Sequence, residues 1–168
     1  MKLDRARPLI LAALGLAGLA VADPALAQKA VFLVRHAEKL DATDDTPLSA
    51  AGAARAESLA KSLAAVGVKA VFATQYQRTV LTAQPLMTRL GLKPIVVHSD
   101  ATQEMVDRIR KDHANDVVLI AGHSGSVPRA LKMLGVTETV EIAETEFDNL
   151  FVVIPKPSGP PTFLRLKY

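Results

Sequence analysis

The chain has 168 residues, of which 49% are hydrophobic and 22% charged, and none is cysteine. This composition is typical of a folded globular chain and unlike that of a disordered or repetitive one. Without cysteine, disulfides, catalytic thiolates, zinc–thiolate sites and a lipoprotein anchor are excluded.

The N-terminal 27 residues have the layout of a secretory signal peptide. Three basic residues precede an apolar run over residues 9–22, and the pattern Ala-Leu-Ala follows at 25–27. Because the run is shorter than the roughly 20 residues that span a bilayer, we expect cleavage after Ala27 rather than a membrane anchor. We therefore predict a periplasmic or secreted protein, with a signal peptide over residues 1–27 and one domain over residues 28–168.

The net charge is small. It is +3 for the whole chain and falls to +2 without the first 27 residues, which hold three basic and two acidic side chains. Such a charge does not indicate a nucleic-acid partner, or a membrane partner after signal cleavage.

The rest of the chain predicts strands alternating with helices. The first and fourth strands are continuous apolar runs, typical of strands buried on both faces. The six expected strands cover residues 30–34, 70–73, 95–97, 117–121, 150–154 and 163–166.

Four helices are expected between these strands. Ser49 is a favourable N-cap residue for the first, which we expect to stop at Gly67. The second is predicted over residues 77–90.

The third helix follows Asp100, which has capping-box spacing to Gln103. The fourth opens at Ser126 and ends before Gly135. Strands that alternate with helices imply a parallel sheet covered on both faces.

The last two strands should pair differently, because only "PKPSGPP" at 155–161 separates them. This connection is too short for a helical crossover, so we expect an antiparallel hairpin. The predicted fold class is an α/β three-layer sandwich with a mostly parallel central sheet, helices on both faces and an antiparallel edge hairpin.

Polar residues directly follow two of the predicted strands. Arg35 and His36 come after the first strand, and His123 follows the fourth in "GHSGS", which opens a helix. Because ligands of open α/β sheets bind at the carboxyl ends of the strands, we expect these side chains to share a crevice. Arginines and a glycine-rich helix start favour phosphate, and a neutral imidazole beside phosphate is a competent nucleophile.

Three segments resemble the motifs of one known family. "LVRHAEK" at 33–39 resembles the Arg-His-Gly signature of the histidine phosphatase superfamily, in its phosphoglycerate mutase-like branch. "TQYQRTVLTAQPL" at 74–86 is similar to that family's second arginine segment, and "GHSGSVP" at 122–128 is similar to its second histidine loop. The three motifs occur in the family's order, and the matching topology covers nearly all of residues 29–168.

The resemblance implies roles for single residues. His36 would be the nucleophile that forms a phosphohistidine, with its other ring nitrogen held by a backbone carbonyl. Arg35, Arg78 and His123 would bind the phosphate. Ser124 either bonds a phosphate oxygen or caps the following helix. Water would then hydrolyse the phosphohistidine, and the resemblance implies neither a metal nor a cofactor.

Three alternatives are open for the group that donates a proton to the leaving group. The resemblance points to an acidic residue some way after Arg78, and Glu104 lies 26 positions beyond it. Glu104 is equally explained as an acidic residue in a first helical turn, paired with Arg108. Asp100 is the competitor, although as an N-cap it would already have a structural role, and a site with no such acid is the third alternative.

The two residues after His36 need separate interpretations. Ala37 stands where the family usually has glycine, so the loop should adopt an ordinary backbone conformation there. Glu38 is expected to orient Arg35 or Lys39 rather than to act in catalysis.

Other functions are weighed against a phosphatase. "GHSGS" also resembles the nucleophile elbow of a serine hydrolase, but no histidine follows His123 to complete the triad. A non-catalytic phosphate or anion receptor with the same fold remains an alternative. A mutase fits a short exported chain less well, because it needs a closed pocket. We expect an extracytoplasmic phosphorylated small molecule or envelope glycan as substrate, in an accessible pocket.

Overall fold

The computed structural model describes residues 29–168, so the predicted signal peptide lies outside the described residues. The described chain alternates between strands and helices in the predicted order. The elements are β1 (Ala30–Arg35), α1 (Ala50–Leu63), β2 (Val68–Thr74), α2 (Gln77–Leu90), β3 (Pro94–Val97), α3 (Thr102–Asp112), β4 (Val117–Gly122), α4 (Ser126–Met133), β5 (Asn149–Ile154) and β6 (Thr162–Lys167).

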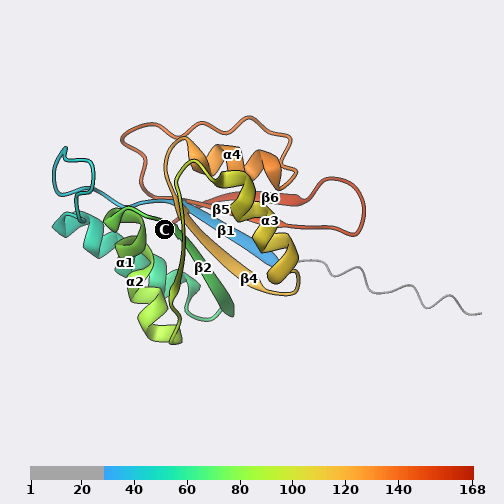
Figure 1. The fold of residues 1–168 in the computed structure, drawn as a ribbon, viewed down its shortest axis with the longest axis horizontal. Coiled ribbons are helices and arrows are strands. Elements are labelled where there is room, and N and C mark those ends of the chain that lie inside the picture. Colours follow the sequence, from blue (N-terminus) through green and yellow to red (C-terminus); the bar gives the residue numbers. More distant parts are fainter. Residues whose placement is uncertain (1–28) are drawn as a thin grey trace, which may run out of the picture.

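One six-stranded sheet runs through the molecule in the order β3-β2-β4-β1-β5-β6 (Figure 1). The pairs β2–β3, β2–β4 and β1–β4 are parallel. The strand β5 is antiparallel to both β1 and β6. The predicted α/β class, with a mostly parallel sheet and an antiparallel edge hairpin, is confirmed.

Each face of the sheet is covered by two helices (Figure 1). On one face, buried residues of β1 such as Leu33 pack with Met105 of α3 and Leu131 of α4. On the other face, Val34 packs with Leu59 of α1 and Leu86 of α2. Neighbouring residues of β1 therefore enter opposite cores, which is why this strand is apolar at every position from Ala30 to Val34.

The order of the strands opens a crevice at the carboxyl ends of β1 and β4. These two strands are hydrogen-bonded neighbours, yet the helix after β1 covers one face of the sheet and the helix after β4 covers the other. The two connections therefore diverge, and ligands of open α/β sheets bind at such a point.

The starts of two helices test the predicted caps. Ser49 caps α1 as predicted, since its Oγ accepts a hydrogen bond of 3.1 Å from the Gly52 N–H. The predicted cap of α3 is wrong: Ala101 occupies the N-cap position, and the Asp100 carboxylate instead contacts the His98 ring. The helix starts one residue later than the cap spacing required, so Asp100 cannot reach its first N–H groups.

The end of α1 also differs from the expectation. The helix ends at Leu63, and Gly67 lies four residues further on in a turn with a φ of +79°. Glycine is favoured there because positive φ is strained for other residues. Within residues 29–168, no helix is long and apolar enough to cross a membrane.

Candidate active site

His36 lies at the end of β1, where the strand gives way to a loop. Its backbone N–H donates to the Gly122 carbonyl oxygen of β4 at 2.8 Å. Its ring Nδ1 lies 2.8 Å from the Ala37 carbonyl oxygen. A carbonyl only accepts hydrogen bonds, so Nδ1 carries the proton and Nε2 keeps its lone pair. This is the tautomer that a nucleophilic Nε2 requires.

The surroundings keep the His36 ring neutral. The side chain is 5% exposed, and this burial is the main reason that its pKa is lowered to about 4. The hydrogen bond to Ala37 opposes the shift, while the positive charges of Arg78 and Arg35 add to it. At neutral pH the imidazole is therefore uncharged and able to attack an electrophile.

His123, at the end of β4, lies against His36. The two ring centroids are 5.4 Å apart. The pKa of His123 is lowered to about 4, first by burial and then by the charge of Arg78. Its Nε2 lies 2.9 Å from the Thr74 hydroxyl, which is 2.9 Å from the Thr79 hydroxyl. Two threonines of the second arginine segment therefore fix the orientation of this ring.

Arg35 is held by the segment 143–147, which precedes β5. Its Nη1 donates to the carbonyl oxygens of Ala143 at 2.8 Å and Glu146 at 3.4 Å. Its Nη2 donates to the Glu144 carboxylate at 2.8 Å, and its guanidinium lies 4.3 Å from the ring centroid of Phe147. The Nε atom is buried and has no hydrogen-bond partner among residues 29–168.

Arg78, at the start of α2, lies close enough to both histidines for its charge to lower their pKa values. Its guanidinium lies 4.2 Å from the ring centroid of Tyr76, and its Nη1 donates to the Asp44 carbonyl oxygen. Its Nε is also buried, without a hydrogen-bond partner in the described part of the chain. A buried N–H donor without a partner is costly, so this feature of both Arg35 and Arg78 suits a site that receives an anion.

The loop after His36 is supported by residues that sequence reasoning did not single out. Thr82 of α2 accepts from the Ala37 N–H at 2.8 Å and donates to the Arg78 carbonyl oxygen at 2.7 Å. No residue other than glycine in the described chain has positive φ, so Ala37 adopts an ordinary conformation as predicted. The signal was available, because Thr82 belongs to the same Thr-x-x-Thr-Ala pattern as Thr79.

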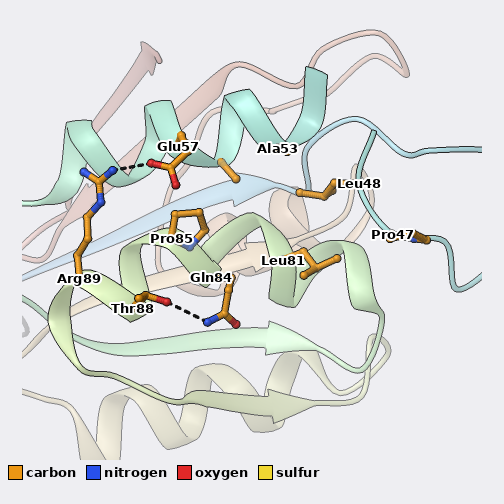
Figure 2. A pocket seen from close by; sticks show the side chains of 10 residues that line it. Pro47, Leu48, Ala53, Glu57, Leu81, Gln84, Pro85, Thr88 and Arg89 are labelled. Atoms are coloured by element: carbon orange, nitrogen blue, oxygen red, sulfur yellow. Dashed lines mark hydrogen bonds and ion pairs between the residues drawn. The ribbon is translucent and has the colours of Figure 1, made fainter. Parts of the chain in front are cut away.

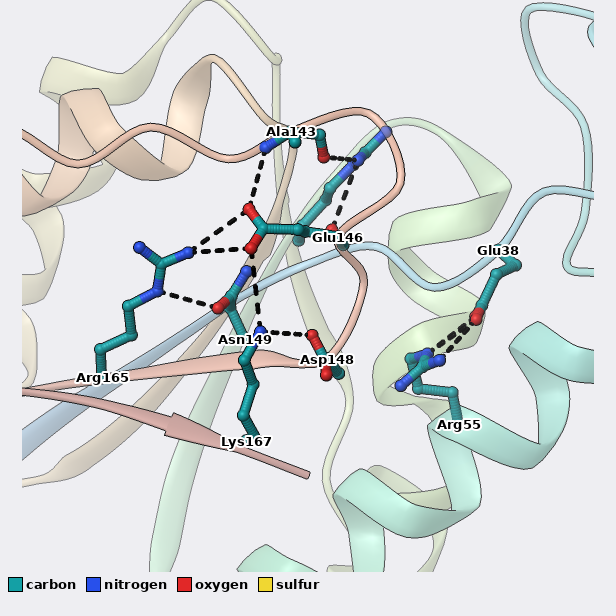
Figure 3. A network of polar contacts seen from close by, with 9 residues as sticks. Glu38, Arg55, Ala143, Glu146, Asp148, Asn149, Arg165 and Lys167 are labelled. Atoms are coloured by element: carbon teal, nitrogen blue, oxygen red, sulfur yellow. Dashed lines mark hydrogen bonds and ion pairs between the residues drawn. The ribbon is translucent and has the colours of Figure 1, made fainter.

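The expectation for Glu38 is wrong. Its carboxylate does not orient Arg35 or Lys39 but accepts two hydrogen bonds of 2.9 Å from Arg55 Nε (Figure 3). The fork of Arg55 matches a carboxylate better than a single ammonium does. This ion pair ties the loop after His36 to α1.

A second polar network shapes the segment that holds Arg35 (Figure 3). The Glu146 carboxylate accepts from the Ala143 N–H at 3.0 Å and from Arg165 of β6 at 3.2 Å. Arg165 also donates to Asn149 at 2.9 Å. The carbonyl groups of Ala143 and Glu146 are thereby fixed where Arg35 needs them, and no sequence motif pointed to these residues.

A hollow of about 260 Å³ opens beside His123 and Arg78. Glu104 is not among its lining residues: it is exposed in the first turn of α3, so its role as proton donor stays a prediction. The expected partner of Glu104, Arg108, instead lies 5.9 Å from the Phe72 ring centroid. The hollow is lined by Tyr76, Arg78, Ser99, His123, Gly125, Ser126 and Arg129.

Ser124 contacts Glu144 rather than capping α4. Its hydroxyl donates to the Glu144 carboxylate at 3.3 Å, while Ser126 Oγ accepts from the His123 N–H at 2.9 Å. Ser124 is thereby left near Arg35 at the mouth of the site. Within residues 29–168, no three or more His, Cys, Asp or Glu side chains are grouped so that they could hold a metal ion.

A second hollow, of about 530 Å³, lies between α1 and α2 (Figure 2). Pro47, Leu48 and Pro85 contribute to its walls, and the ion pair between Glu57 and Arg89 borders it. Its lining includes neither histidine nor either arginine of the site above, so we assign the chemistry to the crevice at the ends of β1 and β4.

Comparison with known proteins agrees with this geometry. Residues 31–105 match the model of the Histidine phosphatase superfamily (branch 1). The predicted resemblance to the histidine phosphatase superfamily is confirmed by this match, whose residues include Arg35, His36 and Arg78. No curated protein matches the chain.

Solved structures show the same fold at low sequence identity. The protein histidine phosphatase SixA complexed with tungstate is 21% identical with a TM-score of 0.66, over 82% of this chain and 96% of that chain. A putative alpha-ribazole-5'-P phosphatase from Escherichia coli is 14% identical with a TM-score of 0.68, over 83% and 96%. A mycobacterial glucosyl-3-phosphoglycerate phosphatase is 14% identical with a TM-score of 0.59, over 74% and 89%.

Proposed function

We propose that this protein is a metal-independent phosphomonoester hydrolase that works through a phosphohistidine at His36. The observation that carries the proposal is the state of the His36 ring. Its Nδ1 proton is committed to Ala37, and burial lowers its pKa to about 4. A neutral Nε2 lone pair therefore lies among two arginines and a second histidine at neutral pH.

The reaction divides into two displacements at phosphorus. In the first, His36 Nε2 forms the N–P bond while the P–O bond to the leaving group breaks, and the leaving oxygen takes up a proton. The unpartnered Nε–H groups of Arg35 and Arg78 are available to the phosphoryl oxygens. Fixed positive groups around those oxygens are the main catalytic requirement of a loose phosphoryl transition state.

In the second displacement, water attacks phosphorus and the N–P bond breaks. His36 returns to its neutral form, because the Ala37 carbonyl keeps the proton on Nδ1 throughout. The product is inorganic phosphate, and neither step calls for a metal ion.

The proposal is tested by phosphate release from p-nitrophenyl phosphate in excess chelator, with wild type and His36→Ala side by side. We expect chelator-resistant turnover in wild type and none in the mutant. Turnover that survives in His36→Ala would contradict the proposed nucleophile. If wild type binds tungstate but does not turn over, the anion-receptor alternative replaces the hydrolase.

We further propose that the substrate is extracytoplasmic. This rests on the signal-peptide pattern of residues 1–27. The substrate class would be a phosphorylated small molecule or an envelope glycan phosphate, and the exposed position of the hollow beside His123 suits a varied leaving group. Expression of the full chain in a bacterium should yield a periplasmic product beginning at Gln28 by mass spectrometry, and an uncleaved cytoplasmic product would contradict the proposal.

A further inference from the structure

The Glu144 carboxylate touches two groups of the candidate phosphate pocket. One of its oxygens accepts from Arg35 Nη2 at 2.8 Å, and the other lies 3.3 Å from the Ser124 hydroxyl. A phosphate bound to the Nε and Nη2 edge of Arg35 would therefore lie directly beside this carboxylate. Glu144 is thus within reach of a bound substrate.

Three other carboxylates of the described chain are committed to structural partners. Glu38 is paired with Arg55, and Asp100 contacts His98. Glu146 accepts from the Ala143 N–H and is paired with Arg165. Glu144 differs from these three groups in that its partners, Arg35 and Ser124, belong to the site itself.

The depth of the site places Glu144 on the side of the leaving group. His36 is 5% exposed, so the nucleophile forms the floor, whereas the Glu144 side chain is 83% exposed. In an in-line displacement the leaving group departs opposite the nucleophile, which here is toward solvent. That is the side on which Glu144 lies, and its exposure lets it exchange protons with water.

We propose that Glu144 donates the proton to the leaving group, a role that rests on the proposed hydrolase function. A bound phosphoryl group takes over the Arg35 Nη2–H, which frees the Glu144 carboxyl group to carry a proton from solvent to the leaving oxygen. As the P–O bond breaks, this proton passes to the leaving oxygen. The carboxylate then accepts a proton from the attacking water, which restores Glu144 for the next cycle.

The test compares esters with different leaving groups. The rate of phosphohistidine formation is measured by rapid quench with p-nitrophenyl phosphate, a good leaving group, and ethyl phosphate, a poor one. Glu144→Gln keeps an oxygen that accepts from Arg35 but has no proton to donate as an acid. We expect it to slow the ethyl ester by ~10²-fold or more and the aryl ester by less than about threefold, because nitrophenolate leaves without a proton.

Two further variants sharpen the comparison. Glu141→Gln removes one charge from an exposed position two residues before the segment 143–147 and should leave both rates unchanged. Glu104→Gln tests the donor that the family resemblance suggests. If Glu104→Gln rather than Glu144→Gln slows the ethyl ester selectively, the proposal for Glu144 is overturned.

The remaining outcomes are also distinct. Equal slowing of both esters by Glu144→Gln would show that Glu144 only orients Arg35. Unchanged or faster rates with both esters would show that its carboxylate merely occupies the phosphate position, and either result overturns the proposal while the hydrolase function stands. Wild type that forms no phosphohistidine from either ester overturns the hydrolase function and, with it, the role of Glu144.

Discussion

His36 and His123 share one buried environment, and both are held neutral by it. Burial lowers the pKa of each ring to about 4, against an ordinary value near 6.5. Each ring has one nitrogen engaged, by the Ala37 carbonyl and the Thr74 hydroxyl respectively. Folding therefore opposes the protonation of both histidines, which couples the stability of the protein to pH.

The free energy of unfolding should fall as the pH is lowered from about 6.5 toward 4. In this window the unfolded chain binds protons at both histidines while the folded chain does not, so acid favours unfolding. Urea unfolding of the phosphate-free protein at pH 7 and pH 5 measures the effect. Carboxyl groups with a lowered pKa, such as those of Glu38 and Asp148, also reduce the free energy of unfolding as the pH falls, but mainly at pH values below this window.

A histidine variant provides the control for this pH dependence. His123→Gln has one titrating ring fewer and should show a smaller loss of stability between pH 7 and pH 5. An unchanged pH dependence in this variant would mean that His123 is not the source of the effect.

Arg78 should contribute to kcat/KM through the geometry of its guanidinium as well as through its charge. Arg78→Ala is expected to lower kcat/KM for p-nitrophenyl phosphate by a factor on the order of 10³, since it removes charge stabilisation from the transition state. Arg78→Lys should recover little, because lysine lacks the Nε–H that is buried without a partner. Arg89→Ala, which breaks an exposed ion pair with Glu57, should leave kcat/KM unchanged, and full activity in Arg78→Lys would contradict a bidentate role.

Single residues that carry chemistry are partly visible in the sequence. Arg35, His36 and His123 could be assigned to one crevice because each follows a strand that is apolar enough to recognise. The structure brings them together with Arg78. The contacts of Glu38 and Asp100 could not be predicted, since the choice between several nearby partners depends on distances that the sequence does not contain.

At the scale of elements, the contact between α1 and the loop after β1 shapes the site. Gly52 packs against the backbone of Glu38, and a Cβ at this position would lie 2.3 Å from the Glu38 carbonyl oxygen. The same carbonyl accepts from the Ser49 N–H at 2.9 Å. The start of α1 therefore sets the path of the chain two residues after His36.

Gly52→Ala should destabilise the protein even though it raises helix propensity. In an open helix interior the change would stabilise by about 1 kcal/mol, but here the methyl group must displace backbone, and overpacking typically costs about 1–3 kcal/mol. Activity should also fall, since the loop that carries His36 must move. The measurements are urea unfolding and kcat/KM for p-nitrophenyl phosphate.

Ala51→Gly, one position earlier and exposed, is the matched control. It should cost roughly 1 kcal/mol through helix propensity and leave kcat/KM unchanged. A stabilised and fully active Gly52→Ala variant would show that the contact with Glu38 relaxes freely.

The types of the elements followed from their periodicity, because burial on one or both faces leaves a pattern in the sequence itself. The cap of α3 was wrong for a physical reason. Spacing alone suggested that Asp100 bonds the helix start, but helix boundaries shift by a residue or two, and a shift of one residue is enough to lose a capping bond.

At the scale of the whole molecule, the candidate phosphate pocket joins segments from nearly the full length of the described chain. Arg35 comes from β1, Arg78 from α2 and His123 from the end of β4. The segment that holds Arg35 is 108 residues away at Ala143. A ligand in this pocket therefore links parts of the chain that separate on unfolding.

Inorganic phosphate should stabilise the folded protein through this linkage. A ligand that binds only the folded state adds about 2.7 kcal/mol at one hundred times its Kd, which appears as a rise in Tm. Sodium chloride at equal ionic strength is the control for screening, and Arg78→Ala should lose most of the rise. An equal rise in Arg78→Ala would place phosphate binding elsewhere.

The sequence by itself determined the alternation of strands and helices, the antiparallel end of the sheet and the strand ends that carry Arg35, His36 and His123. These features have local causes, namely the period of apolar residues and the length of connections. Only the tertiary structure decided which groups hold Arg35 and place Glu144 beside it. The antiparallel pairing of β5 with β1 brings residues 143–147 to the site. Most of the hydrogen bonds that hold Arg35 there are accepted by backbone carbonyls. Every residue has such a group, so no sequence pattern marks the ones that bind Arg35.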